Sequence, residues 1–257
     1  MKRSIVGIYL LRRLANEGLK IFTIKKAQEF AKELGINPGY IPEALHHLLK
    51  DGWVERLKRG TYALSAKSGF GTSPHDFEVA MALVKPCAIS HWTAMHYHHL
   101  TQQTPNTIFV MTTSSASVPR NSKKGRFRFI KVKNDCFFGT QKIWVNETQI
   151  QITDPERTLL DGLMMPQYCG DFYEVFHAFK IHVQQINLQK IIQYALKLDS
   201  ATIKRLGWVL DRLGIEKSLL TQLEIAPIKG YRKLDASAPL KGPYNKKWMI
   251  QENIGVV

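Results

Sequence analysis

The sequence predicts an α+β protein with two domains: a small helical domain over residues 1–68, and a mixed α/β domain over residues 74–257 that ends in a helical segment. Three observations support this. Three amphipathic helical patterns precede a strand–turn–strand pattern. A Gly- and Ser-rich stretch at residues 66–74 follows them. A chain of 257 residues, 44% of them hydrophobic, is also long enough to form two separate cores.

The first domain begins with two amphipathic helices. The first, residues 3–16, places five apolar side chains near one face: Ile5, Ile8, Tyr9, Leu11 and Leu14. The second helix follows Thr23, a favourable N-cap residue, and stops at Gly35. Its apolar positions recur at helical spacing: Ile24, Ala27, Phe30, Ala31 and Leu34.

A third helix is predicted from Gly39 to Asp51, after a short turn at residues 35–38. Its buried face consists of Ile41, Leu45, Leu48 and Leu49. Its opposite face carries polar side chains: Tyr40, Glu43, His46, His47 and Lys50. Two strands, residues 53–56 and 61–64, are then joined by a tight basic turn at residues 57–60. This order of helices and hairpin is typical of a winged helix-turn-helix.

A winged helix-turn-helix can bind duplex DNA because an α-helix fits the major groove, where its outward side chains meet base edges. The hairpin tip would place Lys58 and Arg59 on flanking phosphates. The candidate DNA-binding residues are Lys25, Lys26, Tyr40, Glu43, His46, His47, Lys50, Arg56, Lys58 and Arg59. Glu43 does not suit a phosphate, but it can accept a bond from a cytosine amino group. The alternative is a winged helix that makes only protein contacts.

The charge distribution favours a polyanionic partner. The chain has 36 Lys and Arg against 21 Asp and Glu, a net charge of +15. Residues 1–65 and 66–135 each contribute +6, whereas residues 136–257 contribute +3. A surplus of this kind also serves solubility, so the motifs must decide its meaning.

A second basic segment follows a predicted strand at residues 107–112. Residues 120–133 contain seven basic residues and no acidic one: Arg120, Lys123, Lys124, Arg126, Arg128, Lys131 and Lys133. As a strand, this segment would bury Phe127 and Phe129 and expose Arg126 and Arg128. Two interpretations stay open, a solvated edge strand protected by charge or a phosphate-binding surface.

The rest of the second domain mixes strands and helices. A helix over residues 75–84 has Phe77, Ala80, Met81 and Val84 as its apolar side. A strand at residues 87–90 precedes a helix that Ser90 can cap. A hairpin joins residues 142–145 and 148–152, and Thr153 with Glu156 forms a capping box for the next helix. Four helices follow, near residues 171–183, 188–197, 201–213 and 216–222, and Trp248 of the tail packs onto the domain.

Neither a metal site nor a cofactor is predicted. Among His91, His96, His98 and His99, only the pair 96/99 has helical ligand spacing. His46 and His47 are adjacent and point apart on a helix. Glu156, Arg157 and Asp161 are explained by capping and by i,i+4 pairing rather than by catalysis.

The sequence shows no enzyme signature: no Gly-rich phosphate loop, no GxSxG and no HExxH. A nuclease with an unrecognised site is the enzymatic alternative. Three distant cysteines (Cys87, Cys136 and Cys169) exclude a disulfide scaffold or a four-cysteine zinc site, and they favour the cytoplasm. No apolar stretch is long enough to span a membrane, and residues 1–18 fit an amphipathic helix better than a signal peptide.

Several segments in order resemble the AbiEi-type antitoxins of bacterial type IV toxin–antitoxin systems. They are KRGTYAL (58–64), AISHWTAMHYHHLTQQTPNTIFVMT (88–112), ITDPERTLLDGL (152–163), RLGWVLDRLG (205–214), and Lys247, Trp248 and Asn253. The resemblance implies a cytoplasmic autorepressor whose winged helix binds inverted repeats in the promoter of its operon. It also implies that the C-terminal domain opposes a nucleotidyltransferase-like toxin without forming a tight complex with it.

Overall fold

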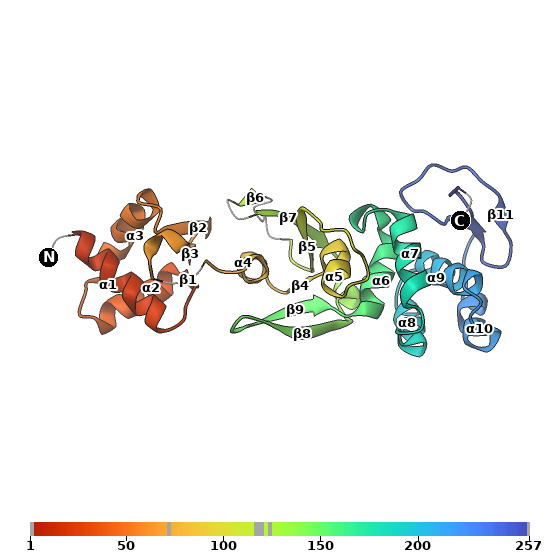
Figure 1. The fold of residues 1–257 in the computed structure, drawn as a ribbon, viewed down its shortest axis with the longest axis horizontal. Coiled ribbons are helices and arrows are strands. Elements are labelled where there is room, and N and C mark those ends of the chain that lie inside the picture. The colour runs from red at the N-terminus through yellow and green to blue at the C-terminus, as the bar shows by residue number, and fades with distance from the viewer. Residues whose placement is uncertain (1–2, 71–72, 116–120, 123–124, 256–257) are drawn as a thin grey trace. The chain divides into compact units, whose positions relative to one another are not determined.

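The computed structural model describes residues 3–70, 73–115, 121–122 and 125–255 (Figure 1). The protein is a mixed α+β chain with a helical N-terminal region, as predicted. It divides into two compact units. The first unit comprises residues 1–85, 115–127 and 145–148, and the second comprises residues 86–114, 128–144 and 149–257.

The first unit is built on three helices, α1 (Arg3–Asn16), α2 (Ile24–Glu33) and α3 (Ile41–Lys50). The buried face of α1 consists of Val6, Leu10, Leu11 and Leu14. The prediction was wrong for Ile8 and Tyr9, which are 38% and 48% exposed. They project from the other side of α1, because successive residues on a helix are about 100° apart. The side chain of Ile5 is outside the described part.

Helix α2 begins and ends close to the predicted residues. The Thr23 hydroxyl accepts a bond from Lys26 N, which confirms the predicted N-cap. Ala27, Phe30 and Ala31 are buried, but Leu34 is 42% exposed. Leu34 follows the last residue of the helix, so it leaves the helical stripe to which it was assigned.

A three-stranded antiparallel sheet completes the helical region, with strand order β1-β3-β2. Its strands are β1 (Ile21–Thr23), β2 (Val54–Lys58) and β3 (Thr61–Leu64). Lys58 pairs with Thr61, so Arg59 and Gly60 form a two-residue turn, and Gly60 has a φ of +74° that favours glycine. The hairpin is confirmed, with a turn of two residues rather than the four expected.

Helix α4 (Asp76–Leu83) follows a short 3-10 turn, Ala66–Ser68. His75 and Glu78 cap it reciprocally. Its buried side consists of Val79, Ala80 and Leu83, whereas Phe77 and Met81, which were predicted to be buried, are half-buried. Ala80 and Val84 are buried as predicted, so the predicted apolar side is correct for two of its four residues.

A six-stranded sheet has the order β6-β7-β5-β4-β9-β8 (Figure 1). Its strands are β4 (Cys87–Ile89), β5 (Thr107–Thr112), β6 (Asn121–Ser122), β7 (Gly125–Lys131), β8 (Thr140–Val145) and β9 (Thr148–Thr153). Strand β4 pairs antiparallel with β5 and parallel with β9. The β8–β9 hairpin is confirmed, and Asn146 occupies its turn with a φ of 53°.

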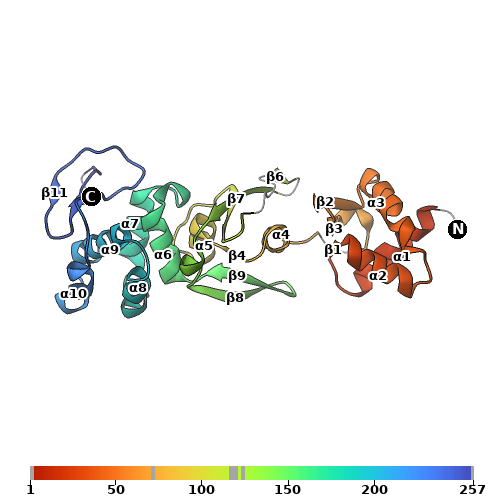
Figure 2. The same ribbon diagram turned by 180° about the vertical axis from the view of Figure 1, so that it is seen from behind.

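The described residues of the second unit form six α-helices: α5 (His91–Tyr97), α6 (Pro155–Met164), α7 (Phe172–His182), α8 (Leu188–Ala195), α9 (Ser200–Arg212) and α10 (Lys217–Ile225). Helices α5 to α8 lie in the predicted segments, whereas α9 begins one residue before the predicted 201–213 and α10 extends to Ile225, beyond the predicted 216–222. Helix α6 packs against α7, α8 and α9, and α9 packs against α10 (Figure 2). Their apolar faces form one core, which includes Leu160, Phe172, Val175 and Leu206.

The predicted capping box at the start of α6 was wrong. The N-cap is Asp154, whose Oδ1 accepts a bond from Arg157 N at 2.8 Å. Thr153 ends strand β9, and its hydroxyl bonds to that of Thr158 at 2.8 Å. Glu156 turns away from the helix start to accept bonds from Asn187 N and Lys190 Nζ. An aspartate one position later therefore outcompetes the Thr153–Glu156 pair.

The chain closes with a small sheet of order β10-β12-β11. Its strands are β10 (Arg232–Lys233), β11 (Tyr244–Asn245) and β12 (Ile250–Gln251). Trp248 is fully buried, as predicted, and its indole N–H donates to Asp211 Oδ2 at 2.8 Å. The indole lies on Gly207 of α9, where an added Cβ would come within 2.0 Å of Trp248 Cζ3.

Candidate nucleic-acid interface

Helix α3 has one face in the core and one face in solvent. Asn37 Oδ1 accepts a bond from Gly39 N, which caps the 3-10 turn Pro38–Tyr40 that leads into α3. Pro42 then occupies the first turn of the helix, where its missing N–H costs nothing. The buried side chains are Ile41, Ala44, Leu45 and Leu48. This packing fixes the direction in which the opposite face of α3 points.

The solvent face of α3 brings together all five of its predicted site residues. Tyr40, Glu43, His46, His47 and Lys50 are exposed. The positions from 43 to 50 follow an i, i+3, i+4, i+7 spacing, so they form one stripe along the helix. The His46 and His47 rings meet edge to face, with centroids 5.8 Å apart. The stripe therefore offers hydrogen-bonding groups at successive turns of one helix.

The hairpin β2–β3 presents two of its three predicted cations to solvent. Arg56 and Arg59 are exposed. Lys58 is half-buried, because its Nζ donates to Leu83 O, near the C-terminal end of α4, at 2.9 Å. A helix C-terminus carries a partial negative charge that suits an ammonium group. Lys58 would have to release this bond before its ammonium could reach a phosphate.

Of the two lysines at the start of α2, one is exposed and the other forms an ion pair. Lys25 is exposed. Lys26 Nζ forms an ion pair with Glu29 at 3.2 Å and lies 4.6 Å from the centroid of the Phe30 ring. The charge of Lys26 is thus partly neutralised within α2, whereas that of Lys25 faces solvent.

The second basic segment is a strand, β7, as predicted. Phe127 is buried, Phe129 is half-buried, and Arg126, Arg128, Lys131 and Lys133 are exposed. The Arg128 guanidinium lies over the Tyr168 ring at 4.9 Å and donates to its hydroxyl at 2.9 Å. Arg120, Lys123 and Lys124 lie outside the described residues.

Polar groups buried in the second unit bind one another. Arg157 Nε and Asp161 Oδ1 form an ion pair at 2.8 Å, with both side chains inaccessible to solvent. Lys190 Nζ bridges Asp154 Oδ2 and Glu156 Oε2. Burial alone would raise the pKa of Glu156, but the bonds from Lys190 and Asn187 outweigh it and lower the pKa. The Arg157–Asp161 ion pair agrees with the predicted i,i+4 pairing, whereas Glu156 binds Asn187 and Lys190 instead of capping α6.

The histidines near α5 have separate surroundings. His91 is buried, and its Nδ1 lies 2.8 Å from the Ser90 hydroxyl. Ser90 occupies the N-cap position of α5, but its side chain does not cap a backbone N–H. His98 Nε2 bonds to Thr153 O at 2.7 Å. Burial is the main cause that lowers the pKa of both rings. His96 and His99 are exposed, and nowhere among the described residues are three His, Cys, Asp or Glu side chains grouped to hold a metal ion.

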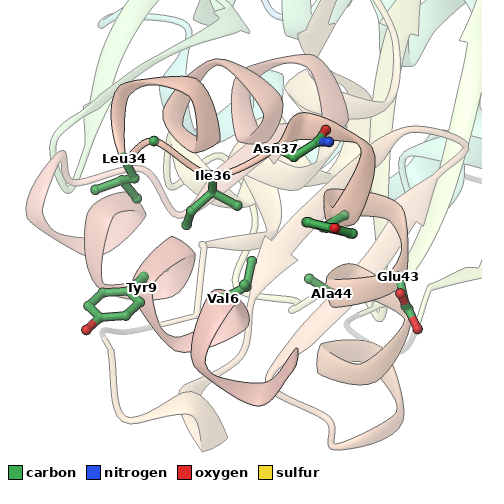
Figure 3. A pocket seen from close by; sticks show the side chains of 9 residues that line it. Val6, Tyr9, Leu34, Ile36, Asn37, Glu43 and Ala44 are labelled. Atoms are coloured by element: carbon green, nitrogen blue, oxygen red, sulfur yellow. The ribbon is translucent and has the colours of Figure 1, made fainter. Parts of the chain in front are cut away.

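An apolar pocket beside α3 was not anticipated from the sequence (Figure 3). It has a volume of about 590 Å³ and is lined by Val6, Tyr9, Leu34, Gly35, Ile36, Asn37, Tyr40, Glu43 and Ala44. Figure 3 shows Tyr9 and Leu34 at one end and Glu43 at the other. Tyr9 and Leu34 were predicted to lie on buried helix faces, whereas in the structure both side chains are exposed and line this pocket.

These features describe a mixed α+β protein whose helical N-terminal unit holds one polar helix face in solvent. Residues 9–65 match the model of a family described as a transcriptional regulator, AbiEi antitoxin. The match confirms the resemblance inferred from the sequence and places it on the region that contains α2, α3 and the sheet β1-β3-β2.

A solved structure extends the comparison to the whole fold. The crystal structure of the RV2827C protein from Mycobacterium tuberculosis is similar, with a TM-score of 0.69 over 96% of this chain and 90% of that chain. The two sequences are 11% identical, so the likeness concerns the fold alone. No curated protein matches the chain. Among the described helices, none is long and apolar enough to cross a membrane.

Proposed function

We propose that this protein is a DNA-binding transcriptional repressor of the AbiEi antitoxin type. Helices α1 to α3 and the sheet β1-β3-β2 would act as a winged helix-turn-helix, with α3 in the major groove. The observation that supports this best is the exposed stripe from Tyr40 to Lys50 on a helix whose other face is fixed in the core. The family match over residues 9–65 agrees with a regulatory role.

Each contact has a distinct role in this proposal. Tyr40, Glu43, His46, His47 and Lys50 would read base edges. Arg56, Arg59 and Lys25 would contact phosphates and set the register of the helix on the duplex. Lys58 and Lys26 would contribute only after leaving Leu83 O and Glu29, respectively.

The biological role proposed is that of a type IV antitoxin in the cytoplasm. Residues 1–68 would bind inverted repeats in the promoter of the operon, and residues 74–257 would oppose a nucleotidyltransferase-like toxin without a tight complex. The protein itself would not be an enzyme. These proposals rest on the family match and on the resemblance of the later segments of the chain.

The test is binding of the full chain to the DNA upstream of its own gene. We expect protection of a repeated sequence and, for about five phosphate contacts, a slope of log K against log salt of roughly −4 to −5. Arg59→Ala should weaken binding to all duplexes alike, whereas His47→Ala should change the preferred sequence. Lys180→Ala, an exposed cation on α7, is the matched control and should leave both unchanged. Intact binding in both the Arg59 and His47 variants would refute the assignment.

The second basic surface has its own test. If Arg126 and Arg128 bind phosphates, Arg126→Ala combined with Arg128→Ala should lower duplex affinity. A loss of toxin neutralisation with intact duplex binding would instead assign this surface to antitoxicity. If both readouts stay unchanged, these side chains only protect the strand β7 by their charge.

A protein-binding role for the first unit is the second candidate. The pocket lined by Val6, Leu34, Ile36 and Ala44 favours it, because exposed apolar hollows often accept protein side chains. In that case, the upstream DNA would show no protected repeat. Ile36→Glu would abolish toxin neutralisation without changing the affinity for DNA.

A further inference from the structure

The C-terminal segment, residues 226–252, concentrates positive charge that the count over the second half of the chain conceals. It contains six cations and two carboxylates. The cations are Lys229, Arg232, Lys233, Lys241, Lys246 and Lys247, and the carboxylates are Asp235 and Glu252. The surrounding helices carry enough acidic residues to reduce the sum for residues 136–257 to +3. A local surplus therefore lies in this one segment.

Both carboxylates of the segment accept hydrogen bonds from neighbouring N–H or O–H groups. Asp235 is buried and accepts bonds from the N–H and the hydroxyl of Ser237. Glu252 Oε1 accepts bonds from Trp208 Nε1 at 2.7 Å and from Asn245 Nδ2 at 2.9 Å. Neither carboxylate thus forms an ion pair with the cations of the segment.

Two of the six cations bind partners other than these carboxylates, and the remaining four are exposed to solvent. Lys247 Nζ binds Asp211 at 2.8 Å, and Lys233 Nζ donates to Ala238 O at 2.7 Å. The remaining four, Lys229, Arg232, Lys241 and Lys246, are exposed. The guanidinium of Arg232 donates to the neighbouring carbonyl, Tyr231 O, which leaves its charge uncompensated.

Two exposed aromatic rings meet within this basic segment. Tyr231 and Tyr244 are 37% and 60% exposed, and their ring centroids lie 4.7 Å apart at an interplanar angle of 63°. Tyr231 immediately precedes β10 and Tyr244 begins β11, the two strands on either side of β12. Neither ring belongs to the hydrophobic core of the second unit. A short sheet therefore holds an exposed aromatic pair within a segment rich in cations.

We propose that this segment binds single-stranded nucleic acid. Tyr231 and Tyr244 would stack on unpaired bases, and Lys229, Arg232, Lys241 and Lys246 would bind the adjoining phosphates. Every base offers a π-face, so aromatic rings combined with a basic surface favour single strands with little sequence preference. Bases within a duplex are already stacked on their neighbours and cannot use the tyrosines. This surface is separate from the one on α3, and the proposal does not depend on the function proposed above.

The test compares a fluorescein-labelled ten-nucleotide oligouridylate with a ten-base-pair duplex of scrambled sequence, by fluorescence anisotropy of the full chain. Replacing both tyrosines, Tyr231→Leu with Tyr244→Leu, should weaken oligouridylate binding about tenfold or more, because stacking of each base contributes substantially. Tyr231→Phe with Tyr244→Phe should keep the affinity, since the ring faces remain. Four phosphate contacts predict a slope of log K against log salt of roughly −3.

Matched variants separate stacking from charge and from the α3 surface. Trp144→Leu removes a ring that is 66% exposed on β8 and should leave oligouridylate binding unchanged. Arg59→Ala should weaken only duplex binding if α3 and the hairpin bind DNA, so the two proposals can fail independently. Circular dichroism and thermal unfolding establish that each variant is folded.

Three results would overturn the proposal. The first is unchanged oligouridylate affinity in the folded Tyr231→Leu/Tyr244→Leu variant. The second is an equal loss in Trp144→Leu. The third concerns heparin, a polyanion that has no bases. If the Tyr231→Leu/Tyr244→Leu variant loses as much affinity for heparin as for oligouridylate, the tyrosines do not act by stacking on bases.

Discussion

Individual buried polar residues are stabilised by specific partners rather than by solvent. Arg157 has no exposed surface, and it combines the ion pair to Asp161 with a position over the Phe138 ring, 4.6 Å from guanidinium to centroid. Gly139 permits this arrangement, since an added Cβ there would lie 2.7 Å from Arg157 Cβ. The i,i+4 spacing predicts the ion pair, but its complete burial depends on strands and helices far away in sequence.

Removing one partner of this buried pair should be costly. In Arg157→Ala, the buried Asp161 would lose its ion-pair partner, so we expect the free energy of unfolding to fall by about 3–5 kcal/mol. The combined change Arg157→Met with Asp161→Leu removes both charges and should lose much less. Urea denaturation measures both. A loss below about 1 kcal/mol in Arg157→Ala, the size expected for a surface pair, would contradict this account.

At the scale of single elements, the sequence predicts the helices and the longer strands well, the buried faces less well, and the short strands β1, β10, β11 and β12 not at all. Helical periodicity locates the helices, and the signals of Thr23, Gly60 and Asn146 are read correctly because capping and turn preferences are local. The exposure of Tyr9 and the bond from Lys58 to Leu83 O depend on which elements pack together, which periodicity does not encode. The pocket beside α3 was missed for the same reason.

The candidate site follows the same division. The polar stripe on α3 could be predicted, since it requires only that the opposite face be buried. The partners of the cations in the hairpin and in α2 could not be predicted. Lys58 binds a carbonyl of helix α4, and Lys26 binds Glu29, one of several side chains within reach on α2. The exposed tyrosine pair was also missed, since Tyr231 precedes β10 and Tyr244 begins β11, and these two short strands are brought together by β12.

The link between α6 and α8 should make stability depend on acidic pH. Glu156 has its pKa lowered below the ordinary value of 4.5, so the bond to Lys190 stabilises the fold above about pH 4.5. This contribution is lost as the pH falls through the lowered pKa of the folded protein. Lys190→Met should therefore flatten the pH dependence of the free energy of unfolding in this range. Lys180→Met is the control, and an equal flattening there would contradict the assignment.

The contact between α9 and the tail depends on Gly207. Alanine has the higher helix propensity by about 1 kcal/mol, which alone would stabilise the Gly207→Ala variant. The new Cβ would lie 2.0 Å from Trp248 Cζ3, and the indole is buried and bonded to Asp211, so it has little room to shift. We expect a net loss of about 1–3 kcal/mol in urea denaturation. In a Trp248→Ala background the same change should become neutral or stabilising, whereas simple additivity would refute the contact.

At the scale of the whole molecule, the described residues include two large clusters of buried apolar side chains, one in each unit. One contains Leu14, Phe30 and Leu45 of the first unit, and the other contains Leu160, Phe172 and Leu206 of the second. The Gly- and Ser-rich stretch at residues 66–74 predicts two domains, residues 1–68 and 74–257. The first compact unit extends further along the chain, to residue 85. The sequence does not predict that residues 115–127 and 145–148 join the first unit, because they are distant along the chain.

Because each cluster buries its own apolar surface, we expect two thermal transitions in calorimetry of the full chain. Leu45→Ala, in α3, should lower the transition of the first unit, and Leu206→Ala, in α9, that of the second; both side chains are almost completely buried, and each change should cost about 2–5 kcal/mol. Adding operator DNA should raise only the transition that Leu45→Ala lowers, since a ligand stabilises the unit that binds it. A single transition lowered equally by both substitutions would show that the clusters unfold together, and a rise confined to the transition of Leu206 would place duplex binding on the second unit.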